Sequence, residues 1–138
     1  MRSFLVCAAA MTAALVSGAC SNNTPTAPTL PEVVTTSETF SGSININGAA
    51  THSFFTTVTG TVTATLTGLD PAETATIGLS MGTWNGATCA IVIANDKAVL
   101  TSVVTGTVST SSGSLCVRVY DVGSLTGQTG YEVQVVHP

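Results

Sequence analysis

Residues 61–67 read TVTATLT and decide the fold class, because apolar and polar side chains alternate along them with a period of two. Val62, Ala64 and Leu66 are predicted to face a core while the threonines face water, as in a half-buried β-strand. An ice-binding array would need the same threonine ladder on neighbouring strands, and none is evident in the sequence. Since β-branched threonine suits the solvent side of a strand, we interpret the ladder as an ordinary strand face.

The same period of two recurs from Thr39 to the end of the chain. Phe40, Ile44 and Ile46 alternate with serines and asparagines, and further strands are predicted at 53–55, 74–81, 88–94, 99–107, 115–121 and 131–136. Turn signals separate these runs, at 47–48, 68–71, 84–86, 95–96, 111–113 and 123–130. About eight short strands with no helical period predict an all-β protein, an antiparallel, jelly-roll-like β-sandwich.

The composition limits what this sandwich can bind. Of 138 residues only 7% are charged, three are lysine or arginine, and the formal net charge is −4. This excludes the basic surface that nucleic-acid binding requires. The hydrophobic share of 44% and the mean hydropathy of +0.48 are too high for a wholly disordered chain. After removal of a leader, the length allows one domain.

The first residues have the pattern of a secretory signal. Arg2 precedes an apolar run over residues 4–16, which is too short to span a membrane, and small residues follow up to Cys20. The sequence Gly18-Ala19-Cys20 resembles the lipobox of bacterial lipoproteins. That resemblance implies a lipoprotein signal peptide at residues 1–19 and acyl chains on Cys20, which would anchor the protein in a membrane of the cell envelope. Cleavage by ordinary signal peptidase is the alternative.

Residues 20–37 are predicted to be a tether, and residues 38–138 a folded domain. The tether is rich in proline and threonine and lacks apolar periodicity, which favours an extended spacer. The domain contains two cysteines, Cys89 and Cys116. Because an exported protein meets an oxidising compartment, we predict a disulfide between them. A thiolate metal site is not expected, since there is no CxxC pair and the chain has only two histidines.

Several segments of the domain resemble the bacterial pre-peptidase C-terminal (PPC) domain. They are residues 52–54, 60–69, 116–121 and 130–135, and the resemblance spans about residues 38 to 136. It implies a PPC-like β-sandwich without catalytic machinery, of the kind appended to secreted hydrolases and tied to secretion, solubility or surface attachment. The chain departs from the family pattern in its cysteine pair, and in Thr76–Leu79, where the family often has an aspartate before an aliphatic strand. No peptidase accompanies the domain in this sequence.

No residues are predicted to be catalytic, so we do not expect an enzyme. Residues 78–82 match the G-x-S-x-G pattern, but the period of two continues through them and no helix follows. Both histidines are poor candidates for a general base, because His137 is penultimate and His52 has no carboxylate close in sequence that could orient it. We expect no cofactor. A structural Ca²⁺ on loop carboxylates is the alternative for Asp70, Glu73, Asp96, Asp121 and Glu132.

Trp84, Asn85 and Tyr120 are the candidate ligand-binding residues. An exposed Trp84 at a turn could stack on a sugar ring, whereas the competing interpretation places it as a cap on the core. Arg118 is expected at a solvated strand position, paired with Asp121 or Glu132. The leading function hypothesis is a non-catalytic envelope or surface lipoprotein whose sandwich serves attachment or assembly, with a glycan or a protein as partner. The alternatives are a carbohydrate-binding module and an accessory subunit of a secreted hydrolase.

Overall fold

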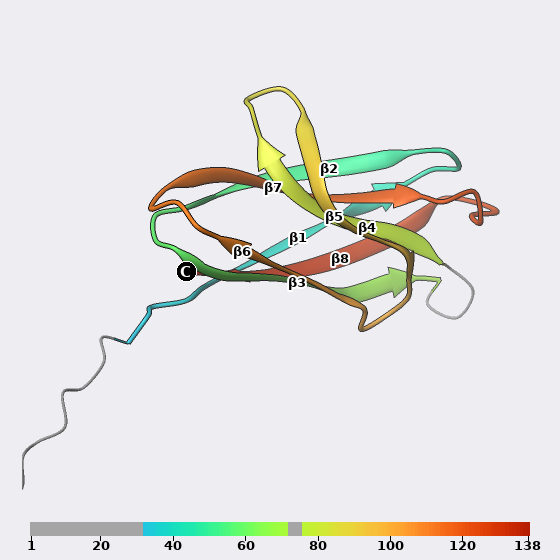
Figure 1. Ribbon diagram of the computed structural model, residues 1–138. Coiled ribbons are helices and arrows are strands. Elements are labelled where there is room, and N and C mark those ends of the chain that lie inside the picture. The colour runs from blue at the N-terminus through green and yellow to red at the C-terminus, as the bar shows by residue number, and fades with distance from the viewer. Residues whose placement is uncertain (1–31, 72–75) are drawn as a thin grey trace, which may run out of the picture. The chain divides into compact units, whose positions relative to one another are not determined.

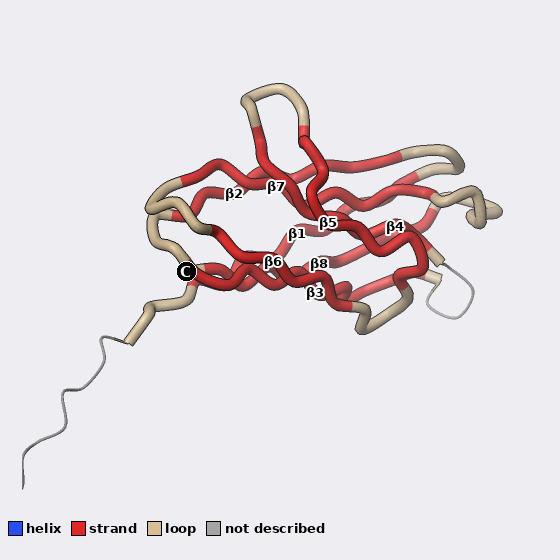
Figure 2. Tube along the Cα trace, viewed as in Figure 1, coloured by secondary structure: helices blue, strands red, loops and turns tan. Residues whose placement is uncertain are grey.

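The computed structural model describes residues 32–71 and 76–138, and these residues form an all-β protein (Figures 1 and 2). The predicted signal peptide, Cys20, most of the predicted tether and Glu73 lie outside the described residues. No helix in the described part could cross a membrane. The eight strands are β1 (Thr36–Ile44), β2 (Ala49–Thr56), β3 (Gly60–Asp70), β4 (Ile77–Trp84), β5 (Cys89–Ala98), β6 (Val103–Val108), β7 (Gly113–Asp121) and β8 (Thr129–His137).

The strands form two four-stranded antiparallel sheets, which confirms the predicted β-sandwich. One sheet has the order β1-β8-β3-β6 and the other has the order β2-β7-β4-β5. Only β4 and β5 are both consecutive in the chain and paired in one sheet; every other connection crosses between the sheets. The free edges are therefore β1 and β2 on one side of the sandwich, and β5 and β6 on the other.

The core lies between the sheets and follows the period of two. Ala64 and Leu66 of β3 are fully buried, and Val62 is nearly so, while the threonines between them are exposed or partly exposed. The facing sheet contributes fully buried Ile77, Leu79, Val117 and Val119. The alternation in the sequence thus predicted correctly which side chains face inward.

The threonine ladder of β3 does continue on a neighbouring strand, contrary to the sequence interpretation. Thr61 pairs with Thr107 of β6, and Thr63 pairs with Thr105. The register between β3 and β6 is a long-range property, so the sequence pattern of either strand alone does not reveal it.

One strand prediction and one turn prediction need correction. Ile46, predicted to face the core, lies in the β1–β2 turn and is 51% exposed. The predicted turn at residues 95–96 is instead part of β5, and the chain reverses at residues 99–102. Backbone hydrogen bonds to β3 hold that reversal, since Leu66 N donates to Ser102 O and Thr101 N donates to Leu66 O. Local bonds also close the turn, since Ser102 N donates to Val99 O at 2.9 Å and Val99 N donates to the Ser102 hydroxyl at 3.0 Å, although the turn contains neither glycine nor proline.

Candidate functional site

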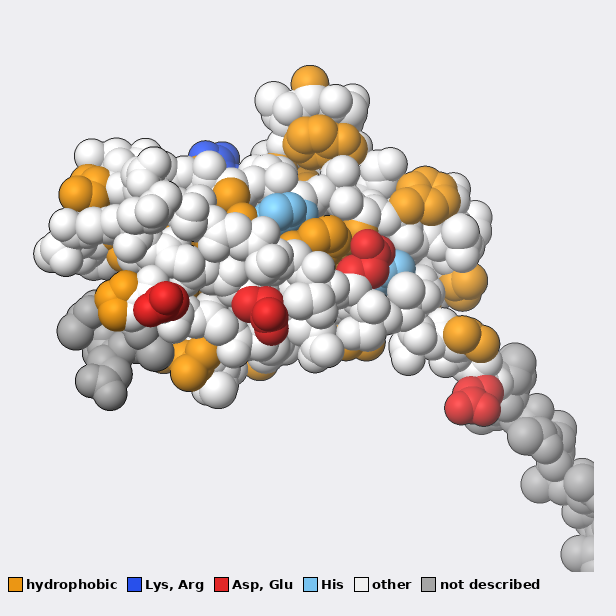
Figure 3. Space-filling model, turned by 180° about the vertical axis from the view of Figure 1, so that it is seen from behind, with side chains coloured by type: hydrophobic (Ala, Val, Ile, Leu, Met, Phe, Trp, Pro, Cys, Tyr) orange, Lys and Arg blue, Asp and Glu red, His pale blue; other side chains and the backbone are white. Residues whose placement is uncertain are grey.

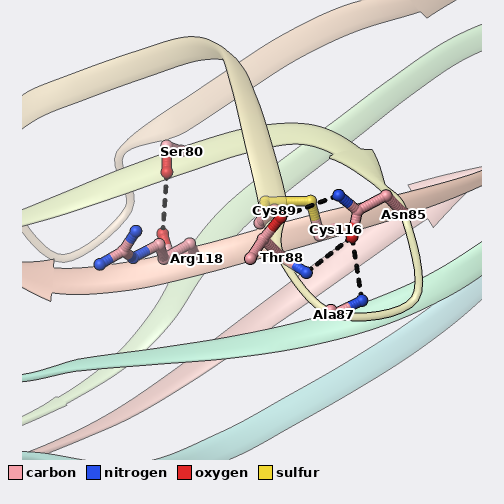
Figure 4. The surroundings of a disulfide bond; sticks show 7 residues. All are labelled: Ser80, Asn85, Ala87, Thr88, Cys89, Cys116 and Arg118. Atoms are coloured by element: carbon pink, nitrogen blue, oxygen red, sulfur yellow. Dashed lines mark hydrogen bonds between the residues drawn. A yellow bond between two sulfur atoms is a disulfide. The ribbon is translucent and has the colours of Figure 1, made fainter.

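The β4–β5 hairpin projects from the sandwich in Figure 1, and its loop is stiffened by one asparagine. The side-chain oxygen of Asn85 accepts hydrogen bonds from the backbone N–H groups of Ala87 (2.9 Å) and Thr88 (2.8 Å). Its amide nitrogen donates to the Thr88 hydroxyl at 2.9 Å (Figure 4). Gly86 adopts a φ of 97°, which favours glycine. The side-chain atoms of Asn85 that could bind a ligand are therefore used to hold the loop in shape.

The predicted disulfide between Cys89 and Cys116 is confirmed, and it fixes the base of the hairpin. The two Cα atoms are 5.8 Å apart, although β4 separates β5 from β7 in the sheet. This is achieved because β5 bends over Gly82 of β4. A Cβ atom at Gly82 would lie 2.6 Å from the carbonyl carbon of Ala90 and 2.8 Å from the Cα of Ile91. The close approach requires glycine, and a shift in the β4–β5 register at Met81/Gly82 accompanies it.

An apolar groove lies beside the hairpin, on the side where β5 and β6 form the free edges. Its volume is about 110 Å³. The side chains that line it include Phe54, Val62, Met81, Val92, Ile93 and Leu115. On β5 itself, Ile91 is 44% exposed and Val92 is 71% exposed. The hairpin and groove together form an apolar surface, and the Cys89–Cys116 disulfide fixes the base of the hairpin.

The structure separates Tyr120 from Trp84 and Asn85. Trp84 is partly exposed near the hairpin tip, opposite Cys89. Tyr120 pairs with Gly78, six residues earlier on β4, a distance of roughly 20 Å along a strand. The Tyr120 hydroxyl donates to Asp96, and burial followed by this hydrogen bond raises the pKa of Tyr120 to about 12. The three candidate residues do not form one binding surface.

Arg118 differs from its prediction. It faces away from the core, but it makes no ion pair with Asp121 or Glu132. Its guanidinium carbon is 5.8 Å from the centre of the Tyr120 ring, and its Nε is buried without a hydrogen-bond partner among the described residues. Ser80 of the G-x-S-x-G match lies beside it, fully buried in the middle of β4, and its hydroxyl donates to the Arg118 carbonyl at 3.4 Å (Figure 4). No turn or helix follows Ser80 directly, so the elbow geometry is not formed.

Both histidines lie toward the opposite edge, His52 on β2 and His137 at the end of β8, where it pairs with Thr36 of β1. His137 is only 3% exposed, and Figure 3 shows where histidine side chains (pale blue) reach the surface of that face. His52 stacks on Phe40 with ring centroids 4.9 Å apart, and its Nε2 is 2.7 Å from the Tyr131 hydroxyl. His137 Nε2 is 2.9 Å from a carboxylate oxygen of Glu38. No local pattern indicates the pair of His137 with Glu38, because 99 residues separate them and only the β1–β8 register brings them together.

The burial of His52 predicts a pH dependence of stability. Burial lowers the pKa of His52 from its usual 6.5, so the unfolded chain binds its proton more tightly than the folded one. The contribution of neutral His52 to the free energy of unfolding is therefore fully present above about pH 6.5. It is lost as the pH falls through the lowered pKa of His52 in the folded protein. Because the ring keeps partial contact with water, the slope should stay below about 1.4 kcal/mol per pH unit, the limit for one proton.

Urea unfolding at several pH values between about 7.5 and 5 measures this effect. We expect His52→Gln, which can still hydrogen-bond to Tyr131, to show a flatter dependence than the wild-type protein. Equal slopes for the two proteins would show that His52 does not contribute.

Three of the candidate calcium ligands are engaged within the protein, and one of them, Glu132, accepts a hydrogen bond from the Thr67 hydroxyl at 2.9 Å. Asp121 accepts backbone hydrogen bonds from Asn47 at 2.8 Å and from Gly123, Ser124 and Leu125 at 2.8 to 3.2 Å. These bonds, with the Asn47 contact first, lower the pKa of the Asp121 carboxyl. Asp96 accepts from Tyr120. Asp121 thus joins the β1–β2 turn to the β7–β8 loop.

Comparison with known proteins gives structural neighbours only. No family model matches the chain, and no curated protein matches it. One similar solved structure is a mitogen derived from Yersinia pseudotuberculosis, with 16% identity, a TM-score of 0.55, and coverage of 74% of this chain and 86% of that chain. Another is PliG of Aeromonas hydrophila, a periplasmic inhibitor of g-type lysozyme, with 16% identity, a TM-score of 0.52, and coverage of 72% and 83%. At this identity the similarity shows a shared fold.

Proposed function

We propose that this protein is an exported, non-catalytic lipoprotein of the bacterial cell envelope whose β-sandwich is presented for attachment or assembly. The leader and Cys20 support export and anchoring, and the Cys89–Cys116 disulfide fits an oxidising compartment. The fold is shared with a periplasmic protein, which agrees with this location.

The observation that carries the proposal is the apolar surface of the hairpin and groove. The disulfide and the Asn85 hydrogen bonds fix the hairpin before any partner arrives, so binding there would cost little conformational entropy. Val92 is largely exposed although it is apolar, and it lines the groove. Exposed apolar surface next to a groove is typical of a site that binds another macromolecule.

Metabolic labelling with an alkyne analogue of palmitate tests the anchor. We expect the full-length protein, expressed in a bacterial host, to be labelled and to sediment with membranes. Cys20→Ser should remove the label because acylation occurs on that thiol, whereas Cys7→Ser, in the leader, should keep it. Equal labelling of Cys20→Ser and the wild-type protein would contradict the proposal.

A carbohydrate-binding module is the second candidate, favoured by the partial exposure of Trp84 on the projecting hairpin. The internal bonds of Asn85 count against it, since its side-chain oxygen already accepts two hydrogen bonds and its amide nitrogen already donates one. Trp84 is the only tryptophan of the chain, so its fluorescence reports on this site directly. A carbohydrate-binding module should show a saturable shift of this fluorescence on addition of peptidoglycan or another polysaccharide. If Asn85→Ala abolishes the shift, the loop takes part in binding the glycan. If the shift is unchanged in Asn85→Ala, the loop does not take part.

The third candidate is an accessory subunit of a secreted hydrolase. It is favoured by the fold shared with PliG, which inhibits a g-type lysozyme. Such a subunit would co-purify with one enzyme in equal amounts through the hairpin surface. Since g-type lysozyme is the hydrolase named for that neighbour, it is the first to assay for inhibition.

A further inference from the structure

The chain enters the sandwich at one end, which we call the tether end (Figure 1). Thr36, the first residue of β1, pairs there with His137, the last residue of β8. The β2–β3 loop, residues 57–59, lies at the same end, because β3 begins after it and runs antiparallel to β8. An anchor at Cys20 would therefore be connected to the domain at the tether end, through residues 21–35.

Exposed apolar side chains lie at the tether end. Val33 and Val34 lead into β1, and both are exposed. Phe55 is the second-last residue of β2, and Val58 follows in the loop; they are 55% and 47% exposed. Phe55 is the most exposed aromatic side chain of the described residues. Exposed phenylalanine with aliphatic neighbours is typical of surfaces that enter the boundary between lipid headgroups and acyl chains.

The charged side chains gather toward the opposite end, which we call the far end. Apart from Glu38, every Asp, Glu, Lys and Arg of the described strands lies in the half of its strand nearest the far end: Asp70, Asp96, Lys97, Arg118, Asp121 and Glu132. Apolar side chains are exposed at the far end too, but they lie among these charges: Ile46, Val99, Leu100 and Val122.

The tether end carries little charge in the described residues. Glu38 is the one carboxylate in the tether-end halves of the strands, and its oxygen lies 2.9 Å from Nε2 of His137. Glu32 lies four residues before β1. Anionic lipid headgroups repel carboxylates, and a carboxylate that enters the bilayer loses its water. The distribution of charge therefore favours the tether end over the far end as the side that faces a membrane.

We propose that the tether end rests on the lipid surface of the membrane, with Phe55 and Val58 inserted at the boundary between headgroups and acyl chains. This inference rests on the proposed anchor at Cys20, and it specifies which side of the domain faces the bilayer. A linker of the length of residues 21–35 keeps the domain near the bilayer at an effective concentration on the order of a millimolar. A weak contact is therefore enough to orient the domain, and the far end points away from the membrane.

Tryptophan fluorescence in vesicles of phosphatidylethanolamine and phosphatidylglycerol tests this orientation. Trp84 is the only tryptophan of the chain, so Trp84→Phe removes the native signal. In that background, Phe55→Trp places a probe at the tether end and Leu100→Trp places one at the far end. The full-length protein is expressed in a bacterial host, purified from membranes and reconstituted.

Bromine atoms on the lipid acyl chains quench a tryptophan that reaches them. We expect brominated lipids to lower the fluorescence of Phe55→Trp by about twofold or more, because this side chain enters the acyl boundary, and to leave Leu100→Trp nearly unchanged. Equal quenching of the two probes, or quenching of neither, would overturn the proposal.

A carboxylate added at the contact tests the proposal by a second route. With the probe at residue 55, Val58→Glu should remove most of the quenching, because the new charge is repelled by anionic headgroups. Val99→Glu at the far end is the matched control, since Val58 and Val99 are 47% and 49% exposed. Quenching that is the same in both variants would contradict the contact.

Palmitate labelling of the same preparations separates this inference from the anchor. If the label is absent, the Cys7→Ser chain is coupled through the Cys20 thiol to a maleimide phospholipid, and the quenching is measured on this form. A labelled protein whose probe at residue 55 is not quenched rejects the contact only. An unlabelled protein whose coupled form is quenched at residue 55 rejects the anchor only.

Discussion

Replacing Gly82 by alanine is expected to destabilise the protein by more than about 4 kcal/mol, a size reserved for severe backbone or core defects. The new Cβ would lie 2.6 Å from the carbonyl carbon of Ala90 and 2.8 Å from the Cα of Ile91. Both are backbone atoms, which cannot rotate away as the end of a side chain can. The variant must therefore lift β5 away from β4, and this moves Cys89 away from Cys116.

Gly106→Ala is the matched control for this substitution. Gly106 also lies in a strand, but its nearest neighbour would be the terminal Cδ1 atom of Ile93, at 3.2 Å, which can move by a few tenths of an ångström. Urea unfolding and the free-thiol content measure both effects. We expect Gly82→Ala to lose stability and to contain reduced cysteines, and Gly106→Ala to stay near the wild-type protein. A stable, fully oxidised Gly82→Ala would show that the hairpin does not need the close approach.

Removing the disulfide is expected to cost roughly 3–4 kcal/mol, from the chain entropy of a loop that closes residues 27 apart in sequence. This is a large share of the 5–15 kcal/mol by which native domains are typically stable. The double variant Cys89→Ala/Cys116→Ala is preferable to a single change. Cys89→Ala alone would leave a free thiol at Cys116, which is fully buried. The hairpin should also loosen, since β5 loses its covalent link to β7.

Chemical denaturation gives the stability loss, and amide hydrogen exchange gives the local effect. Exchange should accelerate most in residues 83–91 and least in β8, which lies in the other sheet. Reduction of the wild-type protein with dithiothreitol should reproduce both results without any substitution. Unchanged exchange in the hairpin would contradict the role assigned to the disulfide.

The sequence predicted those parts of the structure that depend on local patterns. The alternation in residues 61–67 predicted the buried and exposed sides of β3, and Asn47-Gly48 correctly marked a turn. The cysteine pair followed from redox chemistry alone. The strand side and the turn depend on neighbouring residues, and the disulfide depends on the redox state of the compartment. Both kinds of feature can therefore be predicted from a single sequence.

The parts that were wrong or missed depend on long-range register. The turn at residues 99–102 is held by β3, and Glu38 meets His137 only through the β1–β8 pairing. The Tyr120 ring lies over Gly78, where a Cβ would come within 2.6 Å of the ring carbon Cδ2, and only the pairing of β4 with β7 brings these two residues together. The groove combines residues of both sheets and has no sequence pattern of its own. Gly82 did offer a signal, since glycine inside a strand often marks a close backbone approach.

We propose that this chain works outside the cytoplasm, anchored at its N-terminus and cross-linked in its domain. Intact-mass spectrometry of the protein purified from bacterial membranes without reductant tests all of this in one measurement. We predict a chain that begins at Cys20, carries acyl groups there, and has two hydrogens fewer than the reduced form because Cys89 and Cys116 are joined. A mass that corresponds to residues 1–138 with every cysteine reduced and no acyl group would contradict the account.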